Sequence, residues 1–311
     1  MNNRISIEFQ VSVVIPVYNR ERFLMQAVES ALILEEVGEI ILIDDGSSDG
    51  SLNLCKKLVK EHANIILLQH PGGINKGISA SRNLGINNAS QPFIAFLDSD
   101  DWYLPNRFFR GREIFEEFPK ADVIYSSGIL EENQDDLSKI YGLNFDIRKS
   151  IGFNSSPKEF YEKVIKINQI IFQTNGITIK KEFLLKHKLF DERLKLHEDS
   201  ELWMRLLRNG FFFAGEIEKP VAVIRRHENN TITSRSAASA LKMNAVFIEN
   251  VGVSSLYNFE KVNLLKTIIR HKSKSYPGKW KRRLYYYSRF LLWSFHQEYF
   301  LNKFQKNILD D

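Results

Sequence analysis

The stretch Phe93-Ile-Ala-Phe-Leu-Asp-Ser-Asp-Asp101 joins an unbroken apolar run to a cluster of carboxylates. Three earlier apolar runs, at residues 11–15, 39–43 and 65–68, are separated from it and from one another by stretches with helical spacing at 21–34, 51–61 and 78–88. Strands that are apolar on both sides and alternate with helices are typical of a parallel sheet covered on both faces. The sequence therefore predicts an α/β fold with a Rossmann-like, mostly parallel central sheet flanked by helices.

Polar side chains follow three of these runs at the point where each strand should end. Tyr18 and Asn19 follow the first run, Asp44 and Asp45 the second, and Asp98 the fourth. In open α/β sheets ligands bind beyond the carboxyl ends of the strands. We therefore expect these residues to gather at one binding edge.

The rest of the chain is less regular. We expect helices at 105–117, 178–188 and 199–208 and one opening at Ser156, a strand at 121–126, a polar excursion at 131–151 and strand-like pieces within 211–224. From residue 236 the pattern is helical to the end.

Composition narrows the possible function. The chain has 311 residues, 43% apolar and 26% charged, which is ordinary for a globular protein. Its one cysteine, Cys55, excludes a disulfide framework and a CxxC metal site. The first residues do not form a secretory signal, and no apolar run is long enough to span a bilayer, so we expect a cytoplasmic location.

Asp98 and Asp100 carry the strongest local chemical signal. Side chains two residues apart point the same way on extended chain, so two hard oxygen ligands would converge. Mg²⁺ and Mn²⁺ prefer such ligands and keep positions open for phosphate. The alternative is a turn that caps the following helix.

Five segments in a fixed order raise the metal interpretation above that alternative. They are residues 11–19 (VSVVIPVYN), 41–50 (ILIDDGSSDG), 77–85 (GISASRNLG), 96–101 (FLDSDD) and 197–203 (HEDSELW). Together they resemble the inverting family 2 glycosyltransferases, which have a GT-A fold. The resemblance spans about residues 9–230.

The resemblance implies roles position by position. Asp199 matches the catalytic base, Asp98 and Asp100 match the metal-holding motif, and His227 falls where many relatives place a further metal or diphosphate ligand. The implied nucleotide contacts are Pro16, Val17, Tyr18, Asn19, Asp44, Asp45, Lys76, Arg82, Asp98 and Ser99. The acceptor contacts that we expect from the irregular middle of the chain and from the catalytic segment are Asn175, Gly176, Glu198 and Trp203.

Plainer interpretations stand beside several of these roles. Asp199 could merely cap its helix, and His227 could be a structural hydrogen-bond donor. Arg82 could be a solvated helix residue, and the helical spacing of Trp203 suits a core position.

The expected function is that of an inverting, hexosyltransferase-like enzyme, dependent on Mn²⁺ or Mg²⁺. Its donor would be a nucleotide sugar, most simply a UDP-hexose, and its acceptor a glycan or lipid-linked glycan in cell-surface polysaccharide or lipopolysaccharide synthesis. The alternatives are a nucleotidyltransferase of similar fold and a non-catalytic sugar-nucleotide-binding protein. Intact Asp98, Asp100 and Asp199 disfavour the second.

Charge sets the end of the chain apart. Residues 266–311 carry a net charge of +8, against −3 for residues 1–265, and residues 276–300 hold ten aromatic side chains. We expect a transferase domain over 1–230 and a basic, aromatic, helical region over 231–311. That region would lie on an anionic membrane at the inner face of the plasma membrane or pack on the domain. No nucleic-acid-binding module accompanies the charge.

Overall fold

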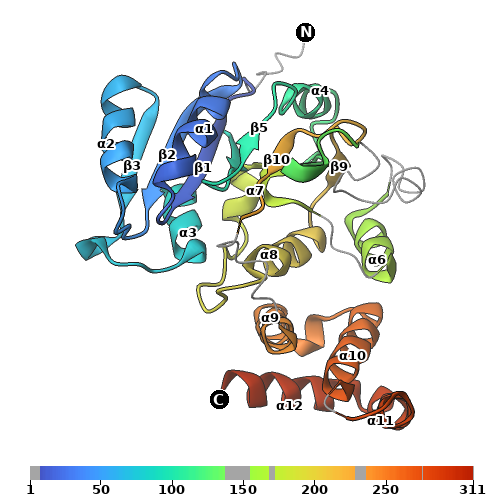
Figure 1. Cartoon of the computed structure of the whole chain (residues 1–311). Coiled ribbons are helices and arrows are strands. Elements are labelled where there is room, and N and C mark those ends of the chain that lie inside the picture. Colours follow the sequence, from blue (N-terminus) through green and yellow to red (C-terminus); the bar gives the residue numbers. More distant parts are fainter. Residues whose placement is uncertain (1–7, 137–154, 168–171, 228–235, 275, 311) are drawn as a thin grey trace.

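The computed structural model describes residues 8–136, 155–167, 172–227, 236–274 and 276–310. Its centre is a seven-stranded sheet in the order β3-β2-β1-β4-β8-β6-β9 (Figure 1). The four strands predicted first are β1 (Val11–Val17), β2 (Val37–Asp44), β3 (Ile65–Gln69) and β4 (Phe93–Phe96), and they pair in parallel. The predicted mostly parallel α/β sheet is confirmed.

Side chains of the central strands alternate between two cores. Val14, Ile41 and Ile43 face one core, whereas Val13 and Ile15 face the other, and all five are fully buried. The second core lies under α1 (Glu21–Leu32), α2 (Ser51–Glu61) and α4 (Phe109–Glu117). The first contains residues of α3 (Ile78–Asn88), α6 (Pro157–Ile167) and α8 (Glu198–Leu207). Burial on both faces explains why these strands are apolar throughout.

The predicted helix over 178–188 is wrong in its first part. Residues Ile177–Lys180 form β8, which runs antiparallel between β4 and β6 (Val123–Tyr125), and only Lys181–Leu185 form a helix, α7. The β-branched residues of Ile177-Thr-Ile179 fit a buried strand better than a helix. Strand β9 (Phe212–Ala214) closes this end of the sheet in parallel with β6.

A small second sheet was not predicted. It joins β5 (Trp102–Tyr103), β10 (Ala222–Ile224) and β7 (Ile129–Leu130). The predicted 105–117 helix begins later, at Phe109, as α4. Most of the predicted 131–151 excursion, and the predicted domain boundary at residue 230, lie outside the described residues.

Four helices end the chain: α9 (Ala237–Val251), α10 (Asn258–Ser273), α11 (Lys279–Ser294) and α12 (Gln297–Leu309). Figure 1 shows them in orange and red as a layer against α6 and α8. Ile248, Ile268 and Leu301 of this layer are fully buried in the same core as β1 and β2. None of the helices in the described ranges has the length and apolarity needed to cross a membrane.

Close packing of α3 on the sheet depends on Gly85. A Cβ there would lie 2.5 Å from Val14 Cγ1 and 2.9 Å from Ile43 Cδ1, both in the core. We expect Gly85→Ala to lower the free energy of unfolding by about 1–3 kcal/mol, the usual result of overpacking. Gly111→Ala is the matched control, because its Cβ would meet nothing closer than Ile124 Cγ2 at 3.8 Å. Urea denaturation measures both, and equal stability of the two variants would contradict this packing.

Candidate active site

The candidate site lies where the loops after β1, β2 and β4 meet the N-terminal end of α8. Arg82, on α3, is its centre: the side chain is 2% exposed. Its Nη2 donates to Asp98 Oδ1 at 2.8 Å and its Nη1 to Glu198 Oε1 at 2.9 Å. Burial opposes the guanidinium charge, but Asp98 and Glu198 outweigh it and raise the pKa of Arg82. Arg82 therefore ties the loop after β4 to the start of α8.

The second carboxylate of the predicted metal motif has partners from two other loops. Asp100 Oδ2 accepts from Arg20 Nε at 3.2 Å and lies 2.9 Å from His227 Nε2. The His227 ring stacks on Phe23, with 5.1 Å between ring centroids. The structure thus brings His227 to Asp100, across 127 residues of sequence.

Asn175 fixes the loop that carries both aspartates. Its Oδ1 accepts from the Asp98 backbone N–H at 3.0 Å, and its Nδ2 donates to Asp101 Oδ2 at 2.6 Å. Asp101 Oδ1 accepts from the Arg225 backbone N–H at 2.8 Å. Burial, together with the charges of Asp98 and Asp100, raises the pKa of Asp101 well above its usual range. The geometry of the loop therefore rests on buried amide and backbone hydrogen bonds.

Asp199 lies in the first turn of α8, facing the same cluster. Its Oδ1 accepts from the Ser200 backbone N–H at 2.6 Å, and Thr174 Oγ1 lies 3.5 Å from its Oδ2. Burial, then the negative charge of Asp199, raises the pKa of the neighbouring Glu198 to about 7 against the attraction of Arg82. Asp199 also contributes to the raised pKa of Asp98, after burial and the charge of Asp100. Asp98 therefore lies within electrostatic reach of both Asp100 and Asp199.

Two carboxylates close β2 and are buried. Asp45 accepts from the backbone N–H groups of Lys76 at 2.7 Å and Gly77 at 2.9 Å, and so holds the loop before α3. Asp44 Oδ2 accepts from Gln69 Nε2 at 3.2 Å, while its Oδ1 is buried without a hydrogen-bond partner among the described residues. An unpaired buried carboxylate oxygen is costly, so Asp44 Oδ1 lacks a donor that the described residues do not supply.

The loop after β1 combines buried and exposed residues. Pro16 and Val17 are buried in β1, whereas 47% of Tyr18 is exposed. Asn19 has a left-handed backbone, φ 53°, and its Oδ1 accepts from the Ser48 backbone N–H at 2.8 Å. Asn19 therefore joins the loops after β1 and β2, and Tyr18 is left free to meet a ligand.

The predicted acceptor residues do not form an open surface. Trp203 is fully buried between Phe96 and Phe190, so its assignment to the acceptor is corrected to the core. Asn175 is 2% exposed and holds the 98–101 loop, and a Cβ on Gly176 would lie 2.3 Å from the Ser126 backbone oxygen. Glu198 is 8% exposed and engaged with Arg82. These four residues are buried and support the site rather than facing an acceptor.

Some of the predicted nucleotide contacts are exposed and others are buried. Lys76 is exposed, and only its backbone takes part in the contacts described above. Ser99 is 5% exposed, and Arg82 lies beneath Asp98 rather than at the surface. The partly exposed side chains at the 98–101 loop are Asp98, Asp100, Arg20 and His227.

The donor set suits a divalent cation bound together with a ligand. Asp98 and Asp100 offer hard carboxylate oxygens. Within the described ranges, Asp98 Oδ2 and Asp100 Oδ1 accept no hydrogen bond. In that part of the chain no three His, Cys, Asp or Glu side chains already form a metal-holding group. The residues fit a cation whose remaining ligands come from phosphate and water.

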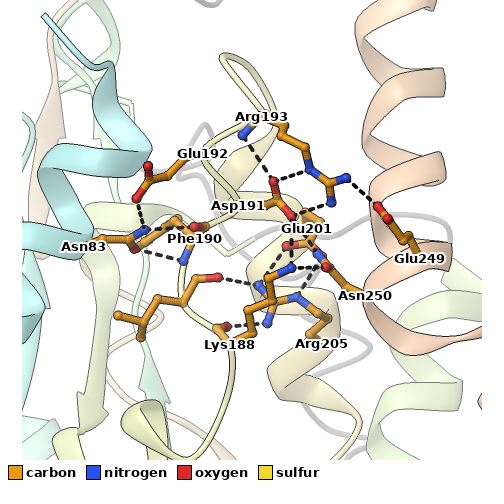
Figure 2. A network of polar contacts seen from close by, with 11 residues as sticks. Asn83, Lys188, Phe190, Asp191, Glu192, Arg193, Glu201, Arg205, Glu249 and Asn250 are labelled. Atoms are coloured by element: carbon orange, nitrogen blue, oxygen red, sulfur yellow. Dashed lines mark hydrogen bonds and ion pairs between the residues drawn. The ribbon is translucent and has the colours of Figure 1, made fainter. Parts of the chain in front are cut away.

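A polar network fixes the segment that leads into α8 (Figure 2). Asp191 accepts from Arg193, with Nε–Oδ1 2.9 Å and Nη2–Oδ2 2.8 Å, and from Asn250 Nδ2 of α9 at 3.1 Å. Asn250 also donates to Glu201 Oε1 of α8 at 2.9 Å, and Glu201 is paired with Arg205. The C-terminal helices therefore take part in positioning the helix that carries Asp199.

We expect Asp191→Asn to lower the free energy of unfolding by about 1.5–3 kcal/mol at pH 7, because hydrogen bonds to a charged group are lost. Burial opposes ionisation, but the hydrogen bonds from Arg193 and Asn250 hold the pKa of Asp191 well below its usual 3.8. A carboxylate with a lowered pKa stabilises the fold above its unfolded pKa and stops doing so as the pH falls.

The stability difference between the native chain and Asp191→Asn should therefore shrink from about pH 5 downward. Urea denaturation at a series of pH values measures it. Asp135→Asn, at an exposed position, is the control and should cost almost nothing. A difference that stays constant down to low pH would show that Asp191 does not act as a charge.

Four contributors to the site were not predicted: Arg20, Asp101, Thr174 and Arg225. Arg20 had a usable signal, because a cation directly after a strand-end loop suits a site rich in carboxylates. Thr174 and Arg225 act through contacts across long sequence separations, which the local pattern does not reveal.

Comparisons with known proteins identify the family and the fold. The sequence profile described as "Glycosyl transferase family 2" matches residues 12–191. The chain is 28% identical to the minor teichoic acid biosynthesis protein GgaA of Bacillus subtilis over 72% of this chain and 49% of GgaA. It is also 28% identical to glycosyltransferase GlyA of Streptococcus pneumoniae, over 54% of this chain and 22% of GlyA. The chain thus spans half or less of the length of these relatives.

Solved structures of S. aureus TarS, residues 1–349, have the same fold. The structure in complex with UDP-GlcNAc matches with a TM-score of 0.65 at 15% identity, covering 96% of this chain and 90% of that one. The structure in complex with UDP matches with a TM-score of 0.60 at 16% identity, covering 90% and 89%. On its sequence profile and its sheet, the chain belongs to glycosyltransferase family 2.

Proposed function

We propose that this chain is an inverting, metal-dependent glycosyltransferase that moves a sugar, most simply a hexose, from a UDP-sugar to a glycan or lipid-linked acceptor in surface-polysaccharide synthesis. The observation that carries the proposal is the Arg82 bridge, which joins the 98–101 loop to the start of α8 through Asp98, 16 residues from Arg82, and Glu198, 116 residues from it. A protein that only binds nucleotides would not need the start of α8 beside the 98–101 loop.

The nucleotide half of the proposal rests on the loops after β1 and β2. Tyr18 offers an exposed ring, and Asp44 Oδ1 is an acceptor in need of a donor, which the N–H of uracil would supply. The TarS structures solved with UDP and with UDP-GlcNAc support a UDP-sugar donor. The name of GgaA, a teichoic acid biosynthesis protein, supports a role in the synthesis of a surface polymer.

The carboxylates have separate roles in the proposed reaction. Asp98 and Asp100 would hold Mn²⁺ or Mg²⁺, with His227 as a further ligand, and the cation would supply charge neutralisation on the leaving diphosphate. Arg82 orients Asp98 through its hydrogen bond from Nη2, and Arg20 orients Asp100 through its hydrogen bond from Nε.

Asp199 acts on the acceptor. It takes the proton of the acceptor hydroxyl as that oxygen forms a bond to the anomeric carbon, and the bond from this carbon to the diphosphate oxygen breaks. Attack from the face opposite the diphosphate inverts the anomeric configuration. A positioned general base of this kind contributes roughly 10²–10⁴-fold to the rate.

The test is a panel of nucleotide sugars incubated with the purified chain and Mn²⁺, with nucleotide release as the readout. We expect release of UDP from at least one UDP-sugar by slow hydrolysis, faster when an acceptor glycan is present. The same reactions with chelator are the control. Release of pyrophosphate from a sugar phosphate and UTP, with no release of UDP, would instead identify a nucleotidyltransferase.

A further inference from the structure

The C-terminal region divides into three helices that contain buried residues and one, α11, that contains none. Helices α9, α10 and α12 each place residues in the main core, as Ile248, Ile268 and Leu301 do. Helix α11 has no buried residue along its whole length, Lys279–Ser294. Figure 1 shows it at the outer edge of the C-terminal layer, away from the sheet. Its inner side packs, Trp293 against the main core and Phe290 under Lys266 of α10, so it is the outward apolar side chains that need another explanation.

Exposed apolar side chains gather on and around this helix. Of the 14 large hydrophobic side chains that are exposed in the described chain, eight lie within residues 276–299. Five of them follow helical spacing and form what we call the α11 stripe: Trp280 84%, Leu284 67%, Tyr287 67%, Leu291 64% and Phe295 77% exposed. At about 3.6 residues per turn, steps of four, three, four and four residues keep one face. A contiguous exposed stripe of this kind marks an interaction surface.

The charge around the stripe indicates what covers it. Helix α11 holds five Lys or Arg residues and no acid, and its sequence neighbours back to residue 266 add no acid. At helical spacing Lys281 and Arg283 border the stripe on its two sides, and both are exposed. An apolar face bordered by cations, with Trp and Tyr among its members, matches a helix lying in the interface of an anionic bilayer.

We propose that the α11 stripe docks this protein on a membrane surface rich in anionic lipid, with α11 lying in the plane of the interface. A second copy of the chain fits the stripe less well, because pairing two stripes would bring two sets of like charges together. This inference stands on α11 alone and does not depend on the proposed transfer reaction.

Vesicle sedimentation with the full chain tests the proposal. One set of vesicles is phosphatidylcholine alone and the other is equal parts phosphatidylcholine and phosphatidylglycerol. We expect sedimentation with the second set only, weakened by added salt. Absence of sedimentation with the anionic vesicles would overturn the proposal, and so would equal binding to both sets.

Two variants separate the apolar and the charge contributions. Trp280→Ser combined with Leu291→Ser removes two exposed members of the stripe, and Lys281→Gln combined with Arg283→Gln removes its bordering charges. We expect each pair to weaken vesicle binding roughly tenfold or more. All four side chains are exposed, so unfolding should be unaffected.

The controls carry the same chemical changes at other exposed positions. Ile33→Ser with Phe109→Ser matches the apolar pair, and Lys56→Gln with Lys60→Gln on α2 matches the charge pair. Both controls should bind vesicles like the native chain, and loss of binding in a control as large as in its partner would contradict the assignment to α11. Dimerisation that the stripe variant abolishes, in a chain that does not bind anionic vesicles, would assign the stripe to a second copy instead.

Discussion

Asp199→Asn should abolish sugar transfer while leaving UDP binding nearly intact. The amide keeps the size of the carboxylate but cannot accept the proton of the acceptor hydroxyl, so the rate should fall roughly 10²–10⁴-fold. The contacts of Asp199 are to Ser200 and Thr174, and none reaches Asp98 or Asp100 directly. Donor binding and base chemistry are therefore separable in this structure.

The measurement is transfer rate and UDP affinity on the same protein preparation. Asp135→Asn is the control for the Asp-to-Asn change, since its side chain is exposed and remote from the site in sequence. A variant at 199 that transferred sugar at a similar rate to the native chain would remove Asp199 from the role of base. Loss of UDP affinity by a similar factor would move Asp199 to the donor side.

Arg82→Met should lower the free energy of unfolding by about 3–5 kcal/mol, because it leaves Asp98 and Glu198 without the guanidinium that pairs with them. Glu198 is almost fully buried, so it would lose its cation without gaining water. Arg82→Lys should recover only part of this loss, since an ammonium cannot reach both carboxylates with the fixed fork of a guanidinium. Arg110→Met is the control, because Arg110 pairs with Glu113 at the surface and should cost less than about 1 kcal/mol.

A double-mutant cycle with Glu198→Gln shows whether the loss belongs to the pair. If Arg82 and Glu198 stabilise the fold through each other, the double variant should be more stable than the sum of the two single losses predicts, by about 0.5–3 kcal/mol. Urea denaturation of the four proteins gives the value. Strict additivity would contradict the bridge on which the proposed function rests.

Much of the fold could be predicted because the deciding signals are local. The apolar runs that became β1, β2 and β4 are buried on both faces, and the predicted 51–61 and 78–88 helices are found as α2 and α3 with those bounds. Strand β8 was missed because four residues, Ile177–Lys180, precede a real helical turn, and their extended state depends on pairing with both β4 and β6. That pairing is tertiary information.

Many residues of the candidate site could be predicted from the sequence, but the contacts between their side chains could not. Strand ends gave Asp44, Asp98 and Asp100, because the carboxyl edge of a parallel sheet is a general binding place. Trp203 was wrong as an acceptor contact, and its helical spacing had already favoured the core position that the structure shows. The bridge through Arg82 was not foreseen, since it depends on how α3 and α8 pack together.

The central claim is that carboxylates from distant segments form one site for a cation and a nucleotide diphosphate. Calorimetric titration of UDP into the native chain, Asp98→Asn with Asp100→Asn, and Asp199→Asn, each with and without Mn²⁺, tests it most directly. The account predicts Mn²⁺-dependent UDP binding in the native chain and in Asp199→Asn, and its loss in the double variant. UDP affinity that is indifferent to Mn²⁺ and to the 98 and 100 substitutions would contradict it.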